Sequence, residues 1–367
     1  MKIENMPPGN RLLIHVLAQL KPAQCGVSDF AIALAQELDA RFGIQSAFAV
    51  VNSTVPCDLP FPKAYCEQPQ LLDLCNSLSG GQPGTILVHL SGYGFSRDGA
   101  PAVLAQALAR VGESGRYRIA VYFHELFARG MPWTSAFWYS SRQKRAVSSI
   151  AAECDLLATS SCLYANWLSR NRGSRSSLPI QVLPVFSNAG EPQVRIVMES
   201  RSPAVAVFGL PGTRRRSYRQ LATVAKLLHR LGVEEIVDIG PAFDAPAELC
   251  GLPVKRVGVL AAPDLESLLS HTRFGFVPHP PLYLAKSGIF AGFCANGVVP
   301  LLAGSFAGAV DGLTDGVHLV SPGTAQAALA AGLDGCSAAA WLWYSGHRLQ
   351  VHAAAYADWL NRLPTGD

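Results

Sequence analysis

Short apolar segments alternate with amphipathic stretches along most of the 367-residue chain, and this alternation restricts the fold more than any other feature. Segments such as 12–18, 85–90 and 119–124 are apolar on both sides of the backbone, which is typical of strands covered by helices on both faces. Strands of this kind that are separated by helices form parallel sheets. The sequence therefore predicts an α/β protein.

The alternation lapses around 187–203, which looks like a linker, and then restarts. Because the length also suits two domains, we expect two Rossmann-like units at 1–187 and 203–337, with a C-terminal helix in 338–367 that packs back toward the first unit. The predicted strands are 12–18, 46–51, 85–90, 119–124, 156–160, 180–184, 204–208, 235–239, 254–257, 274–278, 298–302 and 318–320. The predicted helices are 29–42, 100–110, 140–153, 164–169, 218–231, 265–271, 287–295 and 338–363.

Composition excludes several classes of protein. Hydrophobic residues make up 49% of the chain and charged residues 15%, so two buried cores can form and a disordered chain is excluded. The net charge of +4 does not indicate nucleic acid. The nine cysteines contain no C-x-x-C pair, so we expect neither a metal site nor a disulfide framework. No segment reads as a signal peptide or a membrane span, which predicts a cytoplasmic protein.

Two segments of the first half place candidate site residues where a strand ends. Gly26 follows the first predicted strand, and Ser28 is a favourable N-cap for the next helix. A glycine there lets the backbone approach a ligand near a helix N-terminus, although an ordinary tight turn has the same sequence. His124 and Glu125 end the fourth strand, where doubly wound sheets carry their sites; His124 can donate to a hydroxyl and Glu125 can orient it. The alternative is a histidine that only makes a hydrogen bond at the sheet edge, and His89 is a weaker example of the same pattern.

A basic segment follows the first strand of the second half. Gly209 is followed by Arg214, Arg215 and Arg216, and Ser217 with a glutamine three residues later predicts a capping box. Three arginines in a flexible turn before a helix N-terminus attract phosphate, whereas the alternative is a solvated basic loop. The segment is neither a dinucleotide glycine fingerprint nor a P-loop, which argues against a nicotinamide dehydrogenase.

A second candidate for phosphate binding lies further along the chain. A strand ends at Pro278, and a proline-rich loop leads to Lys286, Ser287 and Gly288 at the start of a helix. Lys286, the Ser287 hydroxyl and the first helical N–H groups could together hold a pyrophosphate. The alternative is a serine-capped helix beside a lysine whose stem covers apolar surface.

Together these segments resemble the GT-B glycosyltransferases, most closely the retaining family 4 type. The resemblance covers most of the chain and includes the Gly26 turn, the strand that ends in His124 and Glu125, and the Gly209 turn with its arginines. It continues with 239–241, 278–279, 291–300 and 315–320. It implies two Rossmann-like domains that face each other across a cleft, the first binding an acceptor and the second a nucleotide-sugar.

The resemblance also assigns roles to residues. Gly26 would lie against donor phosphates or acceptor, and His124 would contact the transferred sugar. Arg214 or Arg215 with Lys286 would neutralise the pyrophosphate, and Ser287 and Gly288 would offer backbone donors. The reaction would need no metal ion and no cofactor, and by analogy it would serve polysaccharide or lipid-linked glycan synthesis.

One departure from the family concerns two glutamates, separated by seven residues, that hold the donor sugar and the ribose. The matching positions here are Leu284 and Gly292, and neither is acidic. This departure leaves open a non-catalytic GT-B protein that binds a nucleotide, glycan or protein partner. An inverting transferase with His124 or Glu125 as the base is a further alternative.

The acceptor is not identified by the sequence and could be a glycan, a lipid-linked sugar or a small molecule. An aromatic segment at 129–141 of the first half could stack on sugar rings, lie on a membrane surface on its cytoplasmic face, or form a helix-packing cluster.

Overall fold

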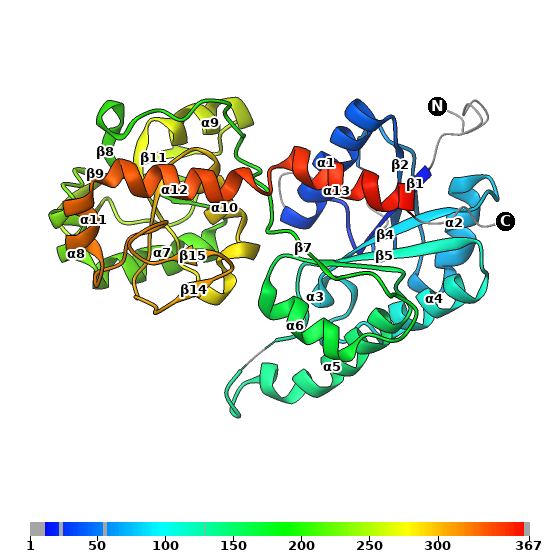
Figure 1. Cartoon of the computed structure of the whole chain (residues 1–367). Coiled ribbons are helices and arrows are strands. Elements are labelled where there is room, and N and C mark those ends of the chain that lie inside the picture. Colours follow the sequence, from blue (N-terminus) through cyan, green and yellow to red (C-terminus); the bar gives the residue numbers. More distant parts are fainter. Residues whose placement is uncertain (1–11, 22–24, 54–56, 129, 363–367) are drawn as a thin grey trace. The chain divides into compact units, whose positions relative to one another are not determined.

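A computed structural model describes residues 12–21, 25–53, 57–128 and 130–362 of the chain (Figure 1). The chain divides into two compact units. The first comprises Met1–Pro184 with Leu349–Asp367, and the second comprises Val185–Arg348. The first unit is therefore built from two separate stretches of sequence, and each unit has a sheet of its own.

The sheet of the first unit has seven parallel strands in the order β3-β2-β1-β4-β5-β6-β7. The order reverses between β1 and β4, so the topological switch point lies between these two strands. The strands are β1 (Leu12–Leu17), β2 (Gln45–Val50), β3 (Lys63–Tyr65), β4 (Gly84–Leu90), β5 (Tyr117–Phe123), β6 (Leu156–Thr159) and β7 (Gln181–Val182).

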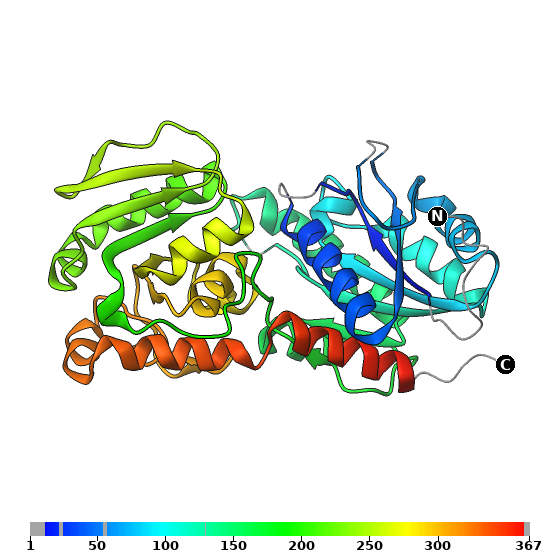
Figure 2. The ribbon, with the colours of Figure 1, turned by 90° about the horizontal axis from the view of Figure 1, so that it is seen from above.

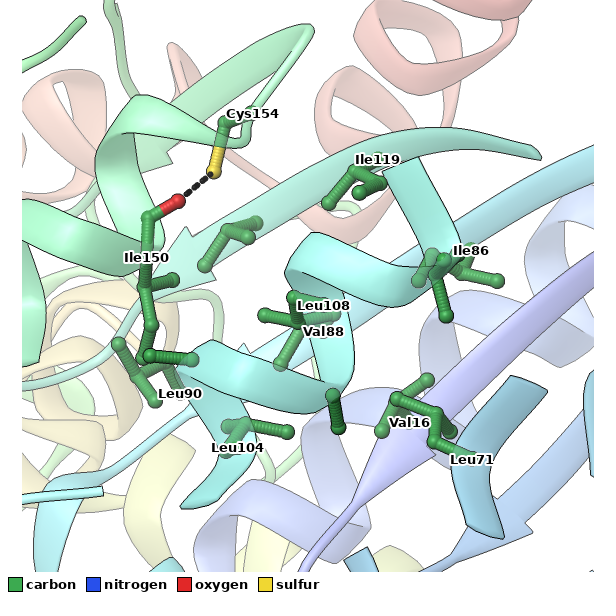
Figure 3. Close-up of a cluster of buried hydrophobic side chains, with 14 of the residues drawn as sticks. Val16, Leu71, Ile86, Val88, Leu90, Leu104, Leu108, Ile119, Ile150 and Cys154 are labelled. Atoms are coloured by element: carbon green, nitrogen blue, oxygen red, sulfur yellow. Dashed lines mark hydrogen bonds between the residues drawn. The ribbon is translucent and has the colours of Figure 1, made fainter. Parts of the chain in front are cut away.

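Helices cover both faces of this sheet. They are α1 (Gly26–Phe42), η2 (Gln68–Gln70), α2 (Leu71–Ser79), α3 (Gly92–Phe95), α4 (Ala102–Glu113), α5 (Ser135–Ala152), α6 (Cys162–Asn171) and α13 (Leu349–Arg362). Figure 3 shows one face, where Val16 and Val88 from the strands meet Leu71 of α2, Leu108 of α4 and Ile150 of α5 in a buried cluster.

The opposite face carries the alternate residues of the same strands. Successive side chains of a strand point to opposite faces, so His15 and Phe48 lie on the face away from the Val16 cluster. Phe30 of α1 packs here, and α13 lies beside α1 (Figure 1). His352 of α13 packs against Phe30 with ring centroids 5.5 Å apart.

The second unit repeats the design. Its sheet has the order β10-β11-β9-β8-β12-β13 and is parallel except for the β10–β11 pair. Its strands are β8 (Ser202–Phe208), β9 (Glu235–Ile239), β10 (Glu248–Leu249), β11 (Leu252–Gly258), β12 (Thr272–Phe276) and β13 (Val299–Leu301), with a separate hairpin of β14 (Ala309–Val310) and β15 (Leu313–Thr314). The order reverses between β8 and β12, which is the switch point of this unit.

The helices of the second unit include several that the sequence did not predict. They are η3 (Met198–Ser200), α7 (Pro211–Thr223), α8 (Ala225–Arg230), α9 (Ala262–Ser270), η4 (Pro281–Lys286), α10 (Gly288–Ala295), α11 (Ala325–Ala331) and α12 (Leu333–Ser345). The helix predicted at 218–231 in fact begins at Pro211 and is interrupted at Val224.

Three further expectations were wrong. The predicted helix 338–363 is two helices, α12 and α13, the orange and red helices of Figure 2; the helical path is interrupted between Ser345 and Leu349, and the two helices belong to different units. The predicted linker around 187–203 packs onto the second unit, where Arg195 makes two hydrogen bonds of 2.6 and 2.8 Å to Asp334. The predicted strand 318–320 forms only isolated bridges, such as Leu301 with Val320.

Candidate functional site

The edge at the switch point of the first unit gathers most of the site residues predicted there. Gly26 begins α1 after β1, and His124 follows β5 directly. The main chain of His124 is fixed by a hydrogen bond of 2.9 Å from its N–H to the Leu90 carbonyl. The Glu125 N–H donates to the same carbonyl at 3.3 Å. Because carboxyl ends of parallel strands share one edge, these residues lie where such sheets bind ligands.

The two polar side chains after β5 have different partners. His124 Nε2 lies 3.5 Å from Nδ1 of His89, the penultimate residue of β4, and its ring packs against Tyr122 with centroids 4.6 Å apart. The Glu125 carboxylate accepts a hydrogen bond of 3.4 Å from the Ser91 hydroxyl. In this arrangement His89 orients the His124 ring, the role that the sequence analysis had given to Glu125.

Gly26 is exposed, and a Cβ there would meet no described atom within 4 Å. Open space at the N-terminus of a long helix allows a ligand to reach the backbone N–H groups. Ser28 is not the N-cap that the sequence predicted. It is fully buried, and its hydroxyl donates to the Gln19 carbonyl at 3.1 Å and accepts from the Lys21 N–H at 3.2 Å, which fixes the loop before α1.

At the switch point of the second unit, two glycines bring the ends of β8 and β9 together. Gly209 has a φ of +125° and Gly240 a φ of +137°, a region that only glycine adopts readily. A Cβ on Gly240 would collide with the Gly209 carbonyl oxygen, and a Cβ on Gly209 would lie 3.0 Å from Ile289 of α10. Gly209 therefore serves close packing at the edge where α7 and α10 begin.

Arg214 lies inside the second unit and not at its surface. Its side chain is 1% exposed, and its guanidinium donates to the Asp238 carboxylate and to the Pro241 carbonyl. Tyr218 donates to the other Asp238 oxygen at 2.7 Å. Because α7 begins at Pro211, Arg214 lies in its first turn and faces the sheet, where Asp238 neutralises it. Its predicted contact with a phosphate finds no support in this position.

The neighbouring cations are accessible. Arg215 is exposed and lies over the Phe243 ring at 5.6 Å from the centroid. Arg216 is exposed too. Its positive charge affects the pKa of His279, a residue that follows β12. Burial first, and then the positive charges of Arg216 and Lys286, lower the pKa of His279 to about 4. Arg216 lies in α7, which follows β8, and Lys286 ends η4, which follows β12, so both cations belong to the elements that leave the switch point.

The helix start beside Lys286 has the expected cap. The Ser287 hydroxyl accepts the N–H of Phe290 at 3.2 Å, so it is the N-cap of α10 and is buried. Gly288 at the first helical position is exposed, with no described atom within 4 Å of a Cβ built on it. Lys286 Nζ lies 4.8 Å from the Tyr283 ring centroid. A cation and an open helix N-terminus therefore occupy the same short segment.

The two positions that carry glutamates in the resembling family cannot hold them here. Leu284 is buried in the core of the unit. Gly292 lies inside α10, where a Cβ would already be 3.2 Å from Ala189 and 3.7 Å from Ser187. A longer acidic side chain would not fit at Gly292 without moving these residues. Neither position therefore supplies an acidic side chain in this unit.

Sequence reasoning assigned no role to three residues in or behind these two edges. Arg216 was named only as part of the arginine cluster, and His279 and His15 were not considered as site residues. The signal for Arg216 is helical spacing, since a helix that begins at Pro211 turns Arg214 inward and leaves Arg215 and Arg216 outward. His15 has no local signal, because its contact with His89 depends on the strand order.

The aromatic segment before and within α5 is exposed. Trp133 is 78% and Trp138 70% exposed, and Met131, Phe137 and Tyr139 are exposed as well, so the helix-packing interpretation was wrong. Arg129 of this segment lies outside the described residues.

No helix in the part of the chain that the structure describes is long and apolar enough to cross a membrane. In that part no group of three or more His, Cys, Asp or Glu side chains is placed to hold a metal ion.

Comparison of the structure identifies similar proteins, although no protein-family model and no curated protein match the sequence. An alpha-glucosyltransferase in complex with UDP-glucose and DNA containing an abasic site is 11% identical with a TM-score of 0.58, over 96% of this chain and 99% of that chain. A trehalose-6-phosphate structure from E. coli, bound with UDP-2-fluoro glucose, is 12% identical with a TM-score of 0.57, over 96% of this chain and 99% of that chain.

A third similar structure is an alpha,alpha-trehalose-phosphate synthase (UDP-forming) from Burkholderia vietnamiensis. It is 13% identical with a TM-score of 0.56, and the match covers 96% of this chain and 97% of that chain. These similarities span nearly the whole length of each protein. They show that the chain has the GT-B fold of two Rossmann-like units, which confirms the predicted fold class.

Proposed function

We propose that this chain is a glycosyltransferase that moves a sugar from a nucleotide-sugar donor to an acceptor. The observation that carries the proposal is the placement of cations at the switch point of the second unit: Arg215 and Arg216 are exposed in α7 after β8, and Lys286 directly precedes the N-cap of α10 after β12. The fold supports the same function, since similar structures hold UDP-glucose or UDP-2-fluoro glucose. We propose that the diphosphate of the donor binds at this cationic edge.

The reaction breaks the bond between the anomeric carbon and the diphosphate, so negative charge develops on the leaving phosphate. Fixed cations and helix-terminal N–H groups stabilise that charge in the transition state. Lys286, Arg216 and the exposed Arg215 supply the cations, and the open start of α10 at Gly288 supplies backbone donors. Removing one such donor typically costs about 2.7–4 kcal/mol of barrier. We propose that these groups act without a metal ion or cofactor.

A binding experiment tests this assignment. Nucleoside diphosphates and their sugars, titrated into the full chain by calorimetry, should bind more weakly to Arg216→Ala with Lys286→Ala, and to Arg215→Ala with Lys286→Ala. Arg230→Ala is the control, since it removes an exposed cation from the far end of α8, at the opposite edge of the sheet. Unchanged affinity in both double variants would remove the proposed diphosphate site.

We propose that the first unit binds the acceptor, with Gly26, His124 and Glu125 at its switch-point edge. The chemical class is a glycan, a lipid-linked sugar or a small molecule with a free hydroxyl. In the retaining reaction the acceptor hydroxyl oxygen bonds to the anomeric carbon on the same face that the phosphate leaves, so no side chain attacks, and the leaving phosphate takes the acceptor proton. The inverting alternative uses His124 or Glu125 as a base. The anomeric configuration of the product distinguishes the two.

A non-catalytic binding protein is the second candidate, and the packing of Gly292 against Ala189 favours it, because it excludes the usual glutamate. Turnover separates the candidates. A panel of nucleotide-sugars should release nucleoside diphosphate if the chain is an enzyme, and should bind without release if it is not. Repeating the active reaction with a chelator tests metal independence.

We also propose that the exposed aromatic segment rests on the cytoplasmic face of a membrane. Between 126 and 152 the sequence has four basic residues and no acidic residue, which favours anionic lipid. The full chain should sediment with phosphatidylglycerol-containing vesicles, and Trp133→Ser with Trp138→Ser should not. Leu342→Ser, which removes an exposed leucine of α12, is the control. Sedimentation that is equal in all variants would contradict this contact, and binding to soluble oligosaccharide would favour sugar stacking instead.

A further inference from the structure

Three histidines of the first unit form a hydrogen-bonded series that ends at a buried serine. His124 Nε2 lies 3.5 Å from His89 Nδ1, and His89 Nε2 lies 2.9 Å from His15 Nδ1. His15 Nε2 then lies 3.2 Å from the Ser46 hydroxyl. The four residues come from β2, β1, β4 and the residue after β5, which are neighbours in the sheet. We call this series the histidine chain.

The histidine chain lies on the sheet face that α1 covers. His15, His89 and Ser46 are each at most 2% exposed, while His124 is half-buried at the strand end. The rings of His15 and His89 stack with centroids 5.2 Å apart, and Phe30 of α1 packs on His89 and His124. Only the His124 end therefore reaches the edge at the switch point.

The buried histidines are neutral at physiological pH. Burial lowers the pKa of His15 to about 3. Burial, and then the nearness of His15 and His124, lowers the pKa of His89 well below its ordinary value. A neutral imidazole has one N–H donor and one acceptor nitrogen. A ring of the histidine chain that donates through one nitrogen must therefore accept through the other. Once the donor and the acceptor of one hydrogen bond in the series are known, the donor and the acceptor of every other one follow.

The Ser46 hydroxyl decides that direction. Within the described part of the chain, its side chain makes a hydrogen bond with His15 and with no other group. If Ser46 accepted from His15, its own O–H would be buried without an acceptor, which is costly. If Ser46 donates, every hydrogen bond in the series is made. The donating arrangement places a proton on Nδ1 of His15, of His89 and of His124.

We propose that Ser46, His15 and His89 are positioning residues that hold His124 as its Nδ1–H tautomer, with Nε2 occupied by His89. His124 then acts as a hydrogen-bond donor through Nδ1. The chain does not conduct a proton, because its inner end is a serine hydroxyl that does not ionise near neutral pH. The histidine chain is thus a device that sets a tautomer.

What the inference says about the reaction rests on the proposed function. It reduces the number of side chains that can act as the base. A His124 that presents Nδ1–H can donate to a hydroxyl or a developing charge on a bound sugar. It cannot take the acceptor proton, since its only lone pair is directed at His89. Of the two mechanisms above, the inference therefore disfavours the inverting one with His124 as the base and leaves Glu125 as its only candidate.

The test is nitrogen-15 NMR of the histidine rings in the ligand-free full chain. Long-range proton–nitrogen correlations distinguish a protonated from an unprotonated ring nitrogen, and through-bond correlations from each ring to its own backbone amide assign His15, His89 and His124 in the unmodified protein. We expect all three rings as Nδ1–H at pH 7. An Nε2–H form of His124 in the unmodified protein would overturn the proposal without any need for a variant to fold.

Variants of the inner end add a causal test. Ser46→Ala should convert His124 to a mixture of tautomers, and Ser46→Thr, which keeps the hydroxyl, should restore Nδ1–H. Ser79→Ala is the control, because it removes a buried hydroxyl that bonds to Tyr117 at 2.8 Å, outside the histidine chain. A His124 tautomer that is unchanged in Ser46→Ala would refute the role of Ser46.

Activity gives a separate readout. In the proposed reaction, Ser46→Ala should lower kcat about tenfold or more with little change in KM for the donor, and Ser46→Thr should recover most of it. If the rings show the expected tautomers but no nucleotide-sugar is turned over, the proposed function fails and the inference stands. If turnover is found and His124 is Nε2–H, the inference fails and the function stands.

Discussion

Acidification should destabilise the first unit, because histidines are buried there in neutral form. His15 and His352 are fully buried. Burial lowers the pKa of His15 to about 3 and that of His352 to about 4. The pKa of a histidine in an unfolded chain is about 6.5. Between these values the unfolded chain binds protons that the folded unit does not. The free energy of unfolding therefore falls as the pH drops below about 6.5, and it keeps falling to about pH 4 for His352 and about pH 3 for His15.

The size of the effect follows from these pKa values. Each pH unit within the window removes about 1.4 kcal/mol of stability per histidine. At pH 5, which is about 1.5 units below the unfolded pKa, His15 and His352 together remove about 4 kcal/mol. The lowered pKa of His89 acts in the same direction. Since domains are typically stable by about 5–15 kcal/mol, this loss is a large share of the total.

Amide hydrogen exchange measures how much stability the first unit loses on acidification, separately from the second unit. The slowest amides of β1 and β4 report its opening, once the intrinsic pH dependence of exchange is corrected. His352→Gln is the matched variant, because His352 Nε2 lies 2.8 Å from the Pro184 carbonyl and a glutamine can supply the same N–H without titrating. Between pH 7 and pH 5 the variant should lose about 2 kcal/mol less than the unmodified chain. Equal losses, or a unit that becomes more stable in acid, would refute the reasoning.

Four other substitutions test the two edges. Gly240→Ala should destabilise the second unit by at least about 2 kcal/mol in urea unfolding, because its Cβ would collide with the Gly209 carbonyl, and an unchanged midpoint would contradict this contact. Arg214→Ala should lower the free energy of unfolding by about 3–5 kcal/mol, because it leaves the buried Asp238 charge without its cation. Arg215→Ala, the comparison, should change this free energy by no more than about 0.5 kcal/mol. Equal losses in the two variants would mean that Arg214 is not buried. Gly26→Ala should leave unfolding within about 0.5 kcal/mol and weaken substrate binding, and undiminished binding in calorimetry would remove Gly26 from the site.

The fold could be predicted from the sequence because its strands are locally encoded. Continuous apolar runs mark β1, β4 and β5, and each run ends where the strand ends, so His124 was placed correctly at the edge of a parallel sheet. The short strands β3, β10, β14 and β15 were missed, since a strand of two or three residues without an apolar run around it carries no period to detect.

Side-chain roles were harder to predict, because they depend on partners that are distant in the sequence. No residue near Arg214 in the sequence indicates its hydrogen bond to Asp238. Because the helix was predicted to start near 218 and in fact starts at Pro211, Arg214 was predicted to be exposed although it is buried. Ser28 has the residue type of an N-cap, yet its hydroxyl bonds to the loop before the helix. The shared cleft and the roles of Ser287 and Gly288 toward a ligand stay predictions.

The contribution of α13 to the first unit has a consequence for biosynthesis. α13 (Leu349–Arg362) follows the second unit in the sequence, and it supplies His352 to the face where Phe30 and Tyr122 pack. During translation the strands of the first unit leave the ribosome early, but this face stays open until the second unit has also been synthesised. The nascent chain must therefore keep an incomplete apolar surface until Leu349–Arg362 has been synthesised, and a chain that stops before Leu349 would expose that surface to chaperones and proteases.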